Sequence, residues 1–402
     1  MTVTNNKTDK LRILHVISHF ALGGAEKCTF ELVEIIDRRV EIGIVAVSGD
    51  DSDEIGQGLA KSARENHVTL YNGVNLPWKY GGFLTAALNL RRIVSEFKPD
   101  IIHLNTEIPE FAWVLCTVIS PSLKQIPVVR TIHNTVLWTG WKRLGRWVET
   151  KLYNANIIYV SEAVRECFLK WRQFCGLSNI SNSTTIYNPI TVSTRRQQLH
   201  NSRMSNKSIR LLFAGRFEFQ KGCDLIPEII SQIKAPEDTD LSLFIYGEGT
   251  YEDLLIQLQD KVIPNWKIEV HPSISNLAEK ISDFDILLFP SRFEGYGRLA
   301  AEAVLAGIPV VAFRLPVLLE IFPAYYPWLV PFNDRNLTEY ADKVSDLLNS
   351  FDKVQPIVDH ARIQLSERLD PHQTALHYLE FYNLIYGKFC HTADKNVEHN
   401  TS

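Results

Sequence analysis

Residues 286–313 read ILLFPSRFEGYGRLAAEAVLAGIPVVAF, and this stretch decides the fold class. An apolar run ends at Pro290, a glycine-containing loop follows, a helical pattern begins near Gly297, and a second apolar run begins at Pro309. A strand, a loop, a helix and a second strand in this order are the repeating unit of a parallel sheet. The pattern therefore predicts an α/β fold with a parallel, doubly wound sheet.

The same alternation of apolar runs and helical patterns such as Phe83–Phe97 covers most of the chain. Predicted strands lie at 11–17, 41–47, 68–71, 101–104, 128–132, 157–160, 209–214, 241–246, 267–271, 286–289 and 309–313. A polar, basic stretch at 191–208 interrupts the alternation and is predicted to be a linker. Residues 11–190 and 209–370 are then two tandem Rossmann-like domains, and 371–390 form a final amphipathic helix.

Composition places the chain among ordinary globular proteins. Its 402 residues are 45% hydrophobic and 22% charged, which excludes collagen-like, low-complexity and disulfide-rich classes. Residues 1–200 carry 23 Lys and Arg against 18 Asp and Glu, a net +5, whereas residues 201–402 carry 19 against 28, a net −9. The basic half favours an anionic partner, such as a phospholipid surface or a phosphorylated acceptor.

Neither an export signal nor a metal site is indicated. The six cysteines contain no Cys-x-x-Cys pair, and the histidines show no metal-ligand spacing. The residues before Arg12 lack the apolar core of a signal peptide, and no run of 18 apolar residues follows. We therefore expect a cytoplasmic protein, with any membrane contact at the inner face of the membrane.

Two carboxylates eight residues apart carry the strongest chemical signal. Glu294 lies in the loop before a predicted helix and Glu302 on its second turn, so both are expected in the crevice at the carboxyl end of the sheet. Carboxylates there can accept hydrogen bonds from the hydroxyls of a sugar or ribose. The backbone N–H groups around Tyr296 and Gly297 begin the helix, where the helix dipole favours an anion. Phosphate and polyol recognition thus meet in one segment.

A second loop, residues 215–222, reads GRFEFQKG and follows the first strand of the second domain. Its Arg216 and Lys221 can bring two cations to a diphosphate. Such cations stabilise a nucleoside-diphosphate leaving group without a metal ion.

Together these segments resemble the family 4 retaining glycosyltransferases of the GT-B fold, over residues 11–390. The motifs that carry the resemblance are Gly23–Glu26, His133–Asn134, Val160–Glu162, Tyr187–Pro189, Gly215–Gly222, Tyr246–Gly249 and Glu294–Glu302. The resemblance implies two domains that face each other across a cleft, with the last helix crossing back to the N-terminal domain.

The resemblance also implies roles for single residues in the C-terminal domain. Arg216 and Lys221 would hold the donor pyrophosphate, and Glu302 would bind the ribose hydroxyls. Glu294 would bind hydroxyls of the donor sugar, beside the backbone of Tyr296 and Gly297.

In the N-terminal domain, Gly24 would approach the phosphates through its backbone N–H. His133 would contact the transferred sugar. Asn134 and Gly249 would complete the set of substrate-binding residues.

The implied reaction retains the anomeric configuration, and the leaving diphosphate helps to deprotonate the acceptor on the same face. No cofactor or metal is expected. Asp283 and Asp285 look like an Asp-x-Asp metal motif, but they match a position usually held by a structural aspartate in the family. Pro272 and Arg298 depart from the family, where Gly and a small or apolar residue are common, and these departures bear on base or sugar choice.

The favoured function is a metal-independent, hexosyltransferase-type enzyme that moves a sugar from a nucleoside-diphosphate sugar to a saccharide or lipid-linked saccharide. Such a reaction belongs to surface polysaccharide or glycolipid synthesis. A nucleotide-sugar epimerase of similar shape and a non-catalytic nucleotide-sugar-binding protein remain alternatives. An NAD-dependent dehydrogenase is disfavoured because no Gly-x-Gly-x-x-Gly follows the first strand of either domain, and no nucleic-acid partner is predicted.

Residues 137–153 can be drawn as a helix that is rich in tryptophan and basic residues. Trp141, Leu144, Val148 and Leu152 would share one face, with the cations elsewhere. Such a helix suits an anionic membrane surface, but an ordinary helix packed on its own sheet has the same pattern. Both interpretations stay open from the sequence.

Overall fold

The computed structural model describes residues 10–20, 23–36, 39–48, 54–76, 80–178, 180, 182–190, 208–237, 239–261, 263–274, 276–350 and 353–399. Close packing divides the chain into two units. Unit 1 combines Met1–Pro189 with Pro371–Ser402, and unit 2 is Ile190–Asp370. Residues 191–207 of the predicted linker lie outside the described residues, and Ser208 already begins a strand.

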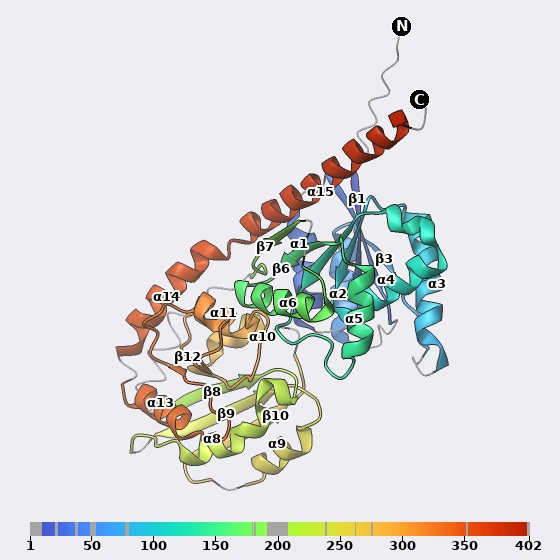
Figure 1. Ribbon diagram of the computed structural model, residues 1–402. Helices are drawn as coiled ribbons and strands as arrows, with labels where there is room; N and C mark the ends of the chain where they lie inside the picture. Colours follow the sequence, from blue (N-terminus) through green and yellow to red (C-terminus); the bar gives the residue numbers. More distant parts are fainter. Residues whose placement is uncertain are drawn as a thin grey trace. The chain divides into compact units, whose positions relative to one another are not determined.

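Unit 1 contains a seven-stranded parallel sheet with the order β3-β2-β1-β4-β5-β6-β7 (Figure 1). Its strands are β1 Leu11–Ile17, β2 Val40–Ala46, β3 Thr69–Tyr71, β4 Ile101–Asn105, β5 Val128–Ile132, β6 Asn156–Tyr159 and β7 Ser183–Thr185. Its helices are α1 Gly24–Ile35, α2 Glu54–Glu65, α3 Gly82–Phe97, α4 Glu107–Ile119, the 3₁₀ turn η2 Pro121–Gln125, α5 Lys142–Lys151, α6 Glu162–Cys175 and α15 Pro371–His399. Because β1 and β4 are buried along almost their whole length, the sequence there is a run of apolar residues rather than an alternation.

Unit 2 repeats the plan with six parallel strands in the order β10-β9-β8-β11-β12-β13. Its strands are β8 Ser208–Ala214, β9 Asp240–Tyr246, β10 Trp266–His271, β11 Ile286–Phe289, β12 Val310–Phe313 and β13 Leu329–Val330. Its helices are η3 Phe219–Lys221, η4 Cys223–Leu225, α8 Ile226–Gln232, α9 Glu252–Gln259, α10 Leu277–Lys280, η5 Ile281–Asp283, α11 Arg298–Leu305, α12 Leu318–Ile321, α13 Thr338–Asn349 and α14 Val354–Arg368.

The predicted α/β class with two parallel sheets is therefore confirmed, and each predicted strand is present within one or two residues. The short strands β7 and β13 were not predicted, because runs of two or three residues carry too little periodicity. The stretch between β10 and β11 holds the short helix α10 followed by the 3₁₀ turn η5.

An aspartate makes the same pair of hydrogen bonds between the two central strands of each sheet. Asp100, just before β4, accepts a hydrogen bond from Arg12 N at 2.8 Å, and its own N–H donates to Arg12 O at 2.8 Å. Asp285, just before β11, makes the same pair with Arg210 at 2.9 and 2.8 Å. Each carboxylate thereby holds the first and fourth strands of its unit in register.

Helix α15 completes the core of unit 1. Ala375, Tyr378, Tyr382 and Ile385 recur at helical spacing and are buried, and the last three belong to the same apolar cluster as strands β1 and β2. Burial of such side chains stabilises the fold by about 1.5–3 kcal/mol each. The helix continues to His399, beyond the predicted end at 390.

Two buried histidines link α15 to the sheet. His103 Nδ1 lies 2.6 Å from the Tyr382 hydroxyl, and its Nε2 lies 2.6 Å from Thr131 Oγ1. The ring of His15 lies 4.5 Å from that of His103. Burial lowers the pKa of His15 to about 3 and that of His103 well below its usual range, so both rings are neutral at pH 7.

Candidate functional site

The predicted donor loops follow β8 and β11, the two neighbouring central strands of the unit 2 sheet. From β8 the chain winds toward one edge of the sheet, and from β11 it winds toward the other edge. Open α/β sheets bind ligands outside the carboxyl ends of the strands at this switch point. The topology therefore brings loop 215–222 and loop 290–297 to one crevice.

Glycine and backbone hydrogen bonds hold the two loops together. Gly222 has φ +67°, and a Cβ there would lie 2.1 Å from Pro290 O, so no larger residue fits. Gln220 donates from Nε2 to Phe293 O at 3.1 Å, and its own carbonyl accepts from Arg292 N at 2.8 Å. The position of the predicted cations relative to the predicted carboxylate is thus fixed by main-chain contacts.

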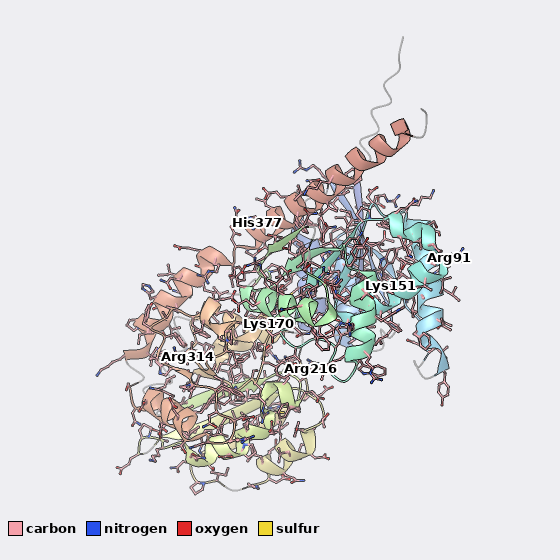
Figure 2. All side chains as sticks on the ribbon, viewed as in Figure 1. Arg91, Lys151, Lys170, Arg216, Arg314 and His377 are labelled. Carbon is pink, nitrogen blue, oxygen red and sulfur yellow. The ribbon has the colours of Figure 1, made fainter. Side chains whose placement is uncertain are left out.

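Lys221 and Glu294 form an ion pair across this junction. Lys221 Nζ lies 2.6 Å from Glu294 Oε1, and the ammonium lies 5.7 Å from the centre of the Phe289 ring. The Glu294 side chain is only 7% exposed, so solvent screens the pair weakly. Arg216 is exposed (Figure 2) and donates from Nη2 to Gln220 Oε1 at 3.2 Å. The two cations predicted to hold a pyrophosphate therefore differ: one is held by a carboxylate, and one faces solvent.

Glu302 has a cationic neighbour as well. Arg298 Nε donates to Glu302 Oε1 at 2.8 Å, one helical turn apart on α11, and both side chains are largely buried. Gly297 begins this helix with φ +75°, where a Cβ would lie 2.7 Å from Leu318. The residue at 298 that departs from the family pattern is thus the one that orients the carboxylate predicted to bind ribose.

Gly249 lies in the third loop, after β9. A Cβ there would lie 2.8 Å from Phe217 O, and Phe217 exchanges backbone hydrogen bonds with Glu248 O at 2.8 Å and Tyr251 N at 3.0 Å. Close packing against the 215–222 loop therefore explains this glycine, and its contact with substrate stays a prediction.

A groove opens beside this loop. Its lining residues are Glu248, Glu252, Ile256, Gln259, Val270, His271 and Pro272. The His271 ring stacks on Tyr246 with centroids 4.9 Å apart and an interplanar angle of 20°. Pro272, the second departure from the family, thus lies on the wall of a surface groove.

Asp285 of the Asp-x-Asp sequence has a structural contact of its own. Asp285 is buried and holds the backbone of Arg210, as described above. Within the described ranges, no group of three or more His, Cys, Asp or Glu side chains is arranged to hold a metal ion.

In unit 1, His133 and Asn134 follow β5 and line a small pocket. The other residues around it are Thr106, Glu107, Glu110, Arg130, Thr131, Ile132, Leu137, Trp138 and Phe168. Its volume of about 10 Å³ holds roughly one water molecule. Burial lowers the pKa of His133 to about 4, so the ring is neutral at pH 7 and offers one donor and one acceptor.

Asn105, at the end of β4, lies beside His133 and was not predicted. His133 Nε2 lies 3.4 Å from Asn105 Oδ1, and the Asn105 amide nitrogen is buried with no hydrogen-bond partner among the described residues. The feature that could have indicated Asn105 is a polar side chain at the carboxyl end of a central strand.

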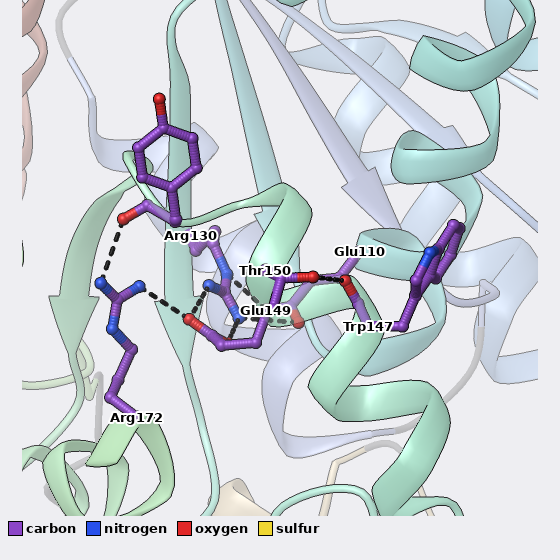
Figure 3. Close-up of polar contacts among 7 residues, drawn as sticks. Glu110, Arg130, Trp147, Glu149, Thr150 and Arg172 are labelled. Atoms are coloured by element: carbon purple, nitrogen blue, oxygen red, sulfur yellow. Dashed lines mark hydrogen bonds and ion pairs between the residues drawn. The ribbon is translucent and has the colours of Figure 1, made fainter. Parts of the chain in front are cut away.

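Four buried charged residues form a network (Figure 3), and two of them, Glu110 and Arg130, line this pocket. Arg130 on β5 donates to both oxygens of Glu110 at 2.9 Å and to both oxygens of Glu149 at 2.9 and 3.0 Å, and Arg172 donates to Glu149 at 2.9 Å. Burial alone would raise the pKa of Glu149, but the two arginines hold it below its usual value. The network joins α4, β5, α5 and α6. The sequence feature that indicates this network is Arg130 within the apolar run 128–132, because a buried charge requires a partner.

Gly24 is the first residue of α1, directly after Gly23, and a side chain at position 24 would meet open space. Its backbone N–H lies at the N-terminus of a helix whose N-cap residue, Gly23, makes no side-chain cap hydrogen bond. Gly24, His133 and Asn134 belong to unit 1, and the other predicted site residues belong to unit 2.

The helix predicted at 137–153 is shorter in the structure, and its buried side differs from the predicted apolar face. α5 spans Lys142–Lys151, so Trp141 precedes the helix and is 67% exposed, whereas Val148 and Leu152 are buried in unit 1. Trp141 does not share their face, which corrects the predicted grouping. Among the described residues, no helix is both long and apolar enough to cross a bilayer.

Comparison with known sequences settles the family. Residues 22–194 match the profile of Glycosyltransferase Family 4, and residues 195–363 match that of Glycosyl transferases group 1. The chain is a family 4 glycosyltransferase. In this glycosyltransferase the Family 4 match thus precedes the group 1 match along the chain.

Relatives and solved structures agree with this assignment. The glycosyltransferase is 25% identical to an uncharacterized 41.2 kDa protein in the cps region of Klebsiella pneumoniae, over 63% of this chain and 69% of the relative. It is 20% identical to the capsular polysaccharide biosynthesis glycosyltransferase CapH of Staphylococcus aureus, over 73% and 78%. The crystal structure of Anabaena HepE in complex with UDP and glucose superposes with a TM-score of 0.73 at 17% identity, over 92% of this chain and 99% of HepE. The likeness to such structures identifies the fold as GT-B.

Proposed function

We propose that this glycosyltransferase moves a hexose from a nucleoside-diphosphate sugar to a saccharide or lipid-linked saccharide, with retention at the anomeric carbon and without a metal ion. The observation that carries the proposal is the junction of loops 215–222 and 290–297, which combines two cations with a buried carboxylate at the switch point of unit 2. That Anabaena HepE was crystallised with UDP and glucose supports a donor of the same class.

Arg216 and Lys221 act on the pyrophosphate. The exposed guanidinium of Arg216 binds phosphate oxygens in a forked geometry, and Lys221 supplies a point charge. When the glycosidic bond to the diphosphate breaks, negative charge grows on the leaving oxygen, and these two cations stabilise it. This is the charge compensation that a divalent cation provides in other sugar transferases.

Glu294 and Glu302 orient the donor. Glu294 accepts hydrogen bonds from donor-sugar hydroxyls while Lys221 holds its carboxylate in place. Glu302 accepts from the ribose hydroxyls, and Arg298 fixes its rotamer. Backbone N–H groups at Tyr296 and Gly297, together with Gly249, complete the donor contacts.

Three residues of unit 1 are also proposed to bind substrate. The Gly24 N–H approaches the phosphates, and neutral His133, with Asn134 beside it, binds the transferred sugar. The acceptor hydroxyl attacks the face that the diphosphate leaves, and a diphosphate oxygen takes its proton. Bond formation, bond cleavage and proton transfer then balance without an enzyme nucleophile, a metal or a cofactor.

Surface polysaccharide or glycolipid synthesis at the cytoplasmic face of the membrane is the setting that we propose. The similarity to CapH, a capsular polysaccharide biosynthesis glycosyltransferase, supports it. A lipid-linked acceptor requires contact of the enzyme with a membrane.

A thermal-shift panel of UDP, GDP, ADP, CMP and NAD, with and without Mg²⁺, tests the donor site. A ligand at 100 times its Kd stabilises the folded state by about 2.7 kcal/mol. We expect one nucleoside diphosphate to raise the Tm equally with and without Mg²⁺. A shift that requires Mg²⁺ would refute metal independence, and a shift with NAD alone would refute the donor class.

Two substitutions test the residue roles. Lys221→Ala should weaken diphosphate binding by at least tenfold and nucleoside binding little, whereas Lys261→Ala, which removes an exposed lysine elsewhere in unit 2, should change neither. Glu294→Gln should lower kcat about 100-fold with little change in nucleotide affinity. Equal loss of nucleoside and diphosphate binding in Lys221→Ala would mean that the loop does not contact phosphate.

Turnover assays separate the alternatives. A transferase releases the nucleoside diphosphate only when an acceptor is present, an epimerase converts the sugar without transfer to an acceptor, and a binding protein does neither.

A further inference from the structure

Helices α3, α4 and α5 lie side by side on one face of the unit 1 sheet (Figure 1). Phe83 of α3 contacts Phe111 of α4 with ring centroids 6.1 Å apart, and Phe111 contacts Trp147 of α5 at 6.3 Å. The connections from β1 to β3 run toward one edge and those after β3 run toward the other, so right-handed crossovers put α1 and α2 on the opposite face. The outward sides of α3, α4 and α5 therefore form a continuous surface, which we call the α3–α5 face.

The outward stripe of α4 is apolar along its whole length. Ile108, Phe111, Leu115 and Ile119 recur at helical spacing, and none of them is buried. Val118, beside this stripe, is 52% exposed. A surface helix ordinarily turns polar residues outward, so an apolar outward stripe marks an interaction surface.

Apolar side chains continue on the neighbouring helices. Leu84 and Leu88 lie one turn apart on α3 and are 47% and 49% exposed. Trp141, just before α5, is more exposed than either. An exposed tryptophan ring suits the headgroup region of a bilayer.

Cations outnumber carboxylates around this apolar surface, although the exposed Glu96 of α3 pairs with Arg92 at 3.4 Å. The exposed cations are Arg91, Arg92 and Lys98 on or after α3, Lys124 in η2, and Lys142, Arg143, Arg146 and Lys151 on α5. Figure 2 shows Arg91 and Lys151, which lie on α3 and α5. The one carboxylate of α5, Glu149, is buried and held by Arg130 and Arg172, so the exposed side of α5 carries cations alone. This arrangement depends on the fold and cannot be read from the sequence.

We propose that the α3–α5 face docks on an anionic lipid bilayer. The apolar stripe of α4 enters the boundary between headgroups and acyl chains, and the surrounding cations pair with lipid phosphates. The charge decides the occupant: a second copy of this face would bring like charges together, whereas an anionic bilayer is complementary in both charge and hydrophobicity.

Docking there would hold the His133 pocket at the membrane. Trp138 lines the pocket of His133, and its ring packs so closely on α5 that a Cβ at Gly145 would lie 2.2 Å from Trp138 Cγ. The pocket wall and the docking helix are thus one packed assembly. The link to a lipid-linked acceptor rests on the proposed function, but the docking itself does not.

The test is co-sedimentation of the full chain with vesicles of phosphatidylcholine, with or without phosphatidylglycerol, at low and high salt. The test variant is Arg143→Gln with Arg146→Gln. The matched control is Lys61→Gln with Arg64→Gln, which removes two exposed cations from α2 on the opposite face. Each cation near anionic lipid contributes roughly fivefold, so the test pair should lower the partition coefficient roughly 30-fold and the control pair far less.

A second variant, Val118→Ser with Ile119→Ser, probes the apolar part. It should weaken binding while leaving the salt dependence unchanged, because it removes no charge. Urea unfolding of each variant serves as the folding control, since it reports on unit 1, where all of these substitutions lie. The docking proposal is wrong if the wild-type chain does not bind phosphatidylglycerol vesicles. It is also wrong if the test and control double variants weaken binding equally, even if sugar transfer is observed. Self-association that is abolished by Val118→Ser with Ile119→Ser would assign the surface to a second copy and overturn it as well.

Discussion

Acid should destabilise unit 1 through two particular histidines. His15 and His103 are fully buried, and burial lowers the folded-state pKa of His15 to about 3 and that of His103 well below its usual range. In the unfolded chain both titrate near pH 6.5. The unfolded state therefore binds protons first as the pH falls. The stability that depends on neutral rings is complete above pH 6.5 and is lost progressively below it.

The size of the effect follows from the difference in pKa of each histidine between the unfolded and the folded chain. Each histidine loses about 1.36 kcal/mol per pH unit below pH 6.5, which is about 2 kcal/mol between pH 8 and pH 5. The two together lose about 4 kcal/mol, a large part of the 5–15 kcal/mol that is typical for a folded domain. Because Tyr382 holds His103 at 2.6 Å, separation of α15 from the sheet should accompany the loss.

The free energy of unfolding is measured by urea titration at several pH values from 8 to 5. Hydrogen exchange in peptides of β1 and β4 then reports local opening at the same pH values. The comparison is a variant with His15→Gln and His103→Gln, in which His133 and the carboxylates titrate as in the wild type. The variant should be less stable at pH 8, since it loses the hydrogen bond to Tyr382, but its stability should fall with pH by about 4 kcal/mol less. If the double variant does not fold, Tyr382→Phe, which keeps both titrating rings, should retain the wild-type slope. Parallel wild-type and double-variant pH profiles would refute the reasoning.

Three further substitutions follow from contacts described above. Glu149→Gln should lower the free energy of unfolding by about 3–5 kcal/mol, because it leaves buried arginines without a full partner, whereas the exposed Glu162→Gln should cost less than about 1 kcal/mol in the same urea titration. Gly222→Ala should cost roughly 2 kcal/mol or more, because of its positive φ and the clash with a carbonyl oxygen, and should also weaken nucleotide binding by calorimetry; unchanged affinity would contradict the role of this loop junction. Asn105→Ala should lower kcat about tenfold through loss of the contact to His133, with nucleotide affinity unaltered, and an unaltered kcat would remove Asn105 from the site.

Much of the candidate site could be proposed from the sequence because its signals are local. The carboxylates Glu294 and Glu302, and the cations Arg216 and Lys221, stand in loops that directly follow apolar strands, and strand order then brings those loops to one crevice. Gly222 indicates a turn, because glycine readily adopts the positive φ that this turn requires. Asn105 escaped notice because a single asparagine at the end of a strand has no spacing pattern of its own.

The sequence by itself determined the two α/β units and the family, since hydrophobic periodicity and turn residues act over a few positions. Only the tertiary structure decided which charges meet. Whether Glu149 faces solvent or Arg130, and whether Arg298 is free to contact a ligand or holds Glu302, depends on how helices pack on distant strands. The same packing exposes Trp141 and buries Val148, although both belong to one amphipathic pattern in the sequence. Burial and partner choice are long-range consequences of packing, and no local pattern encodes them.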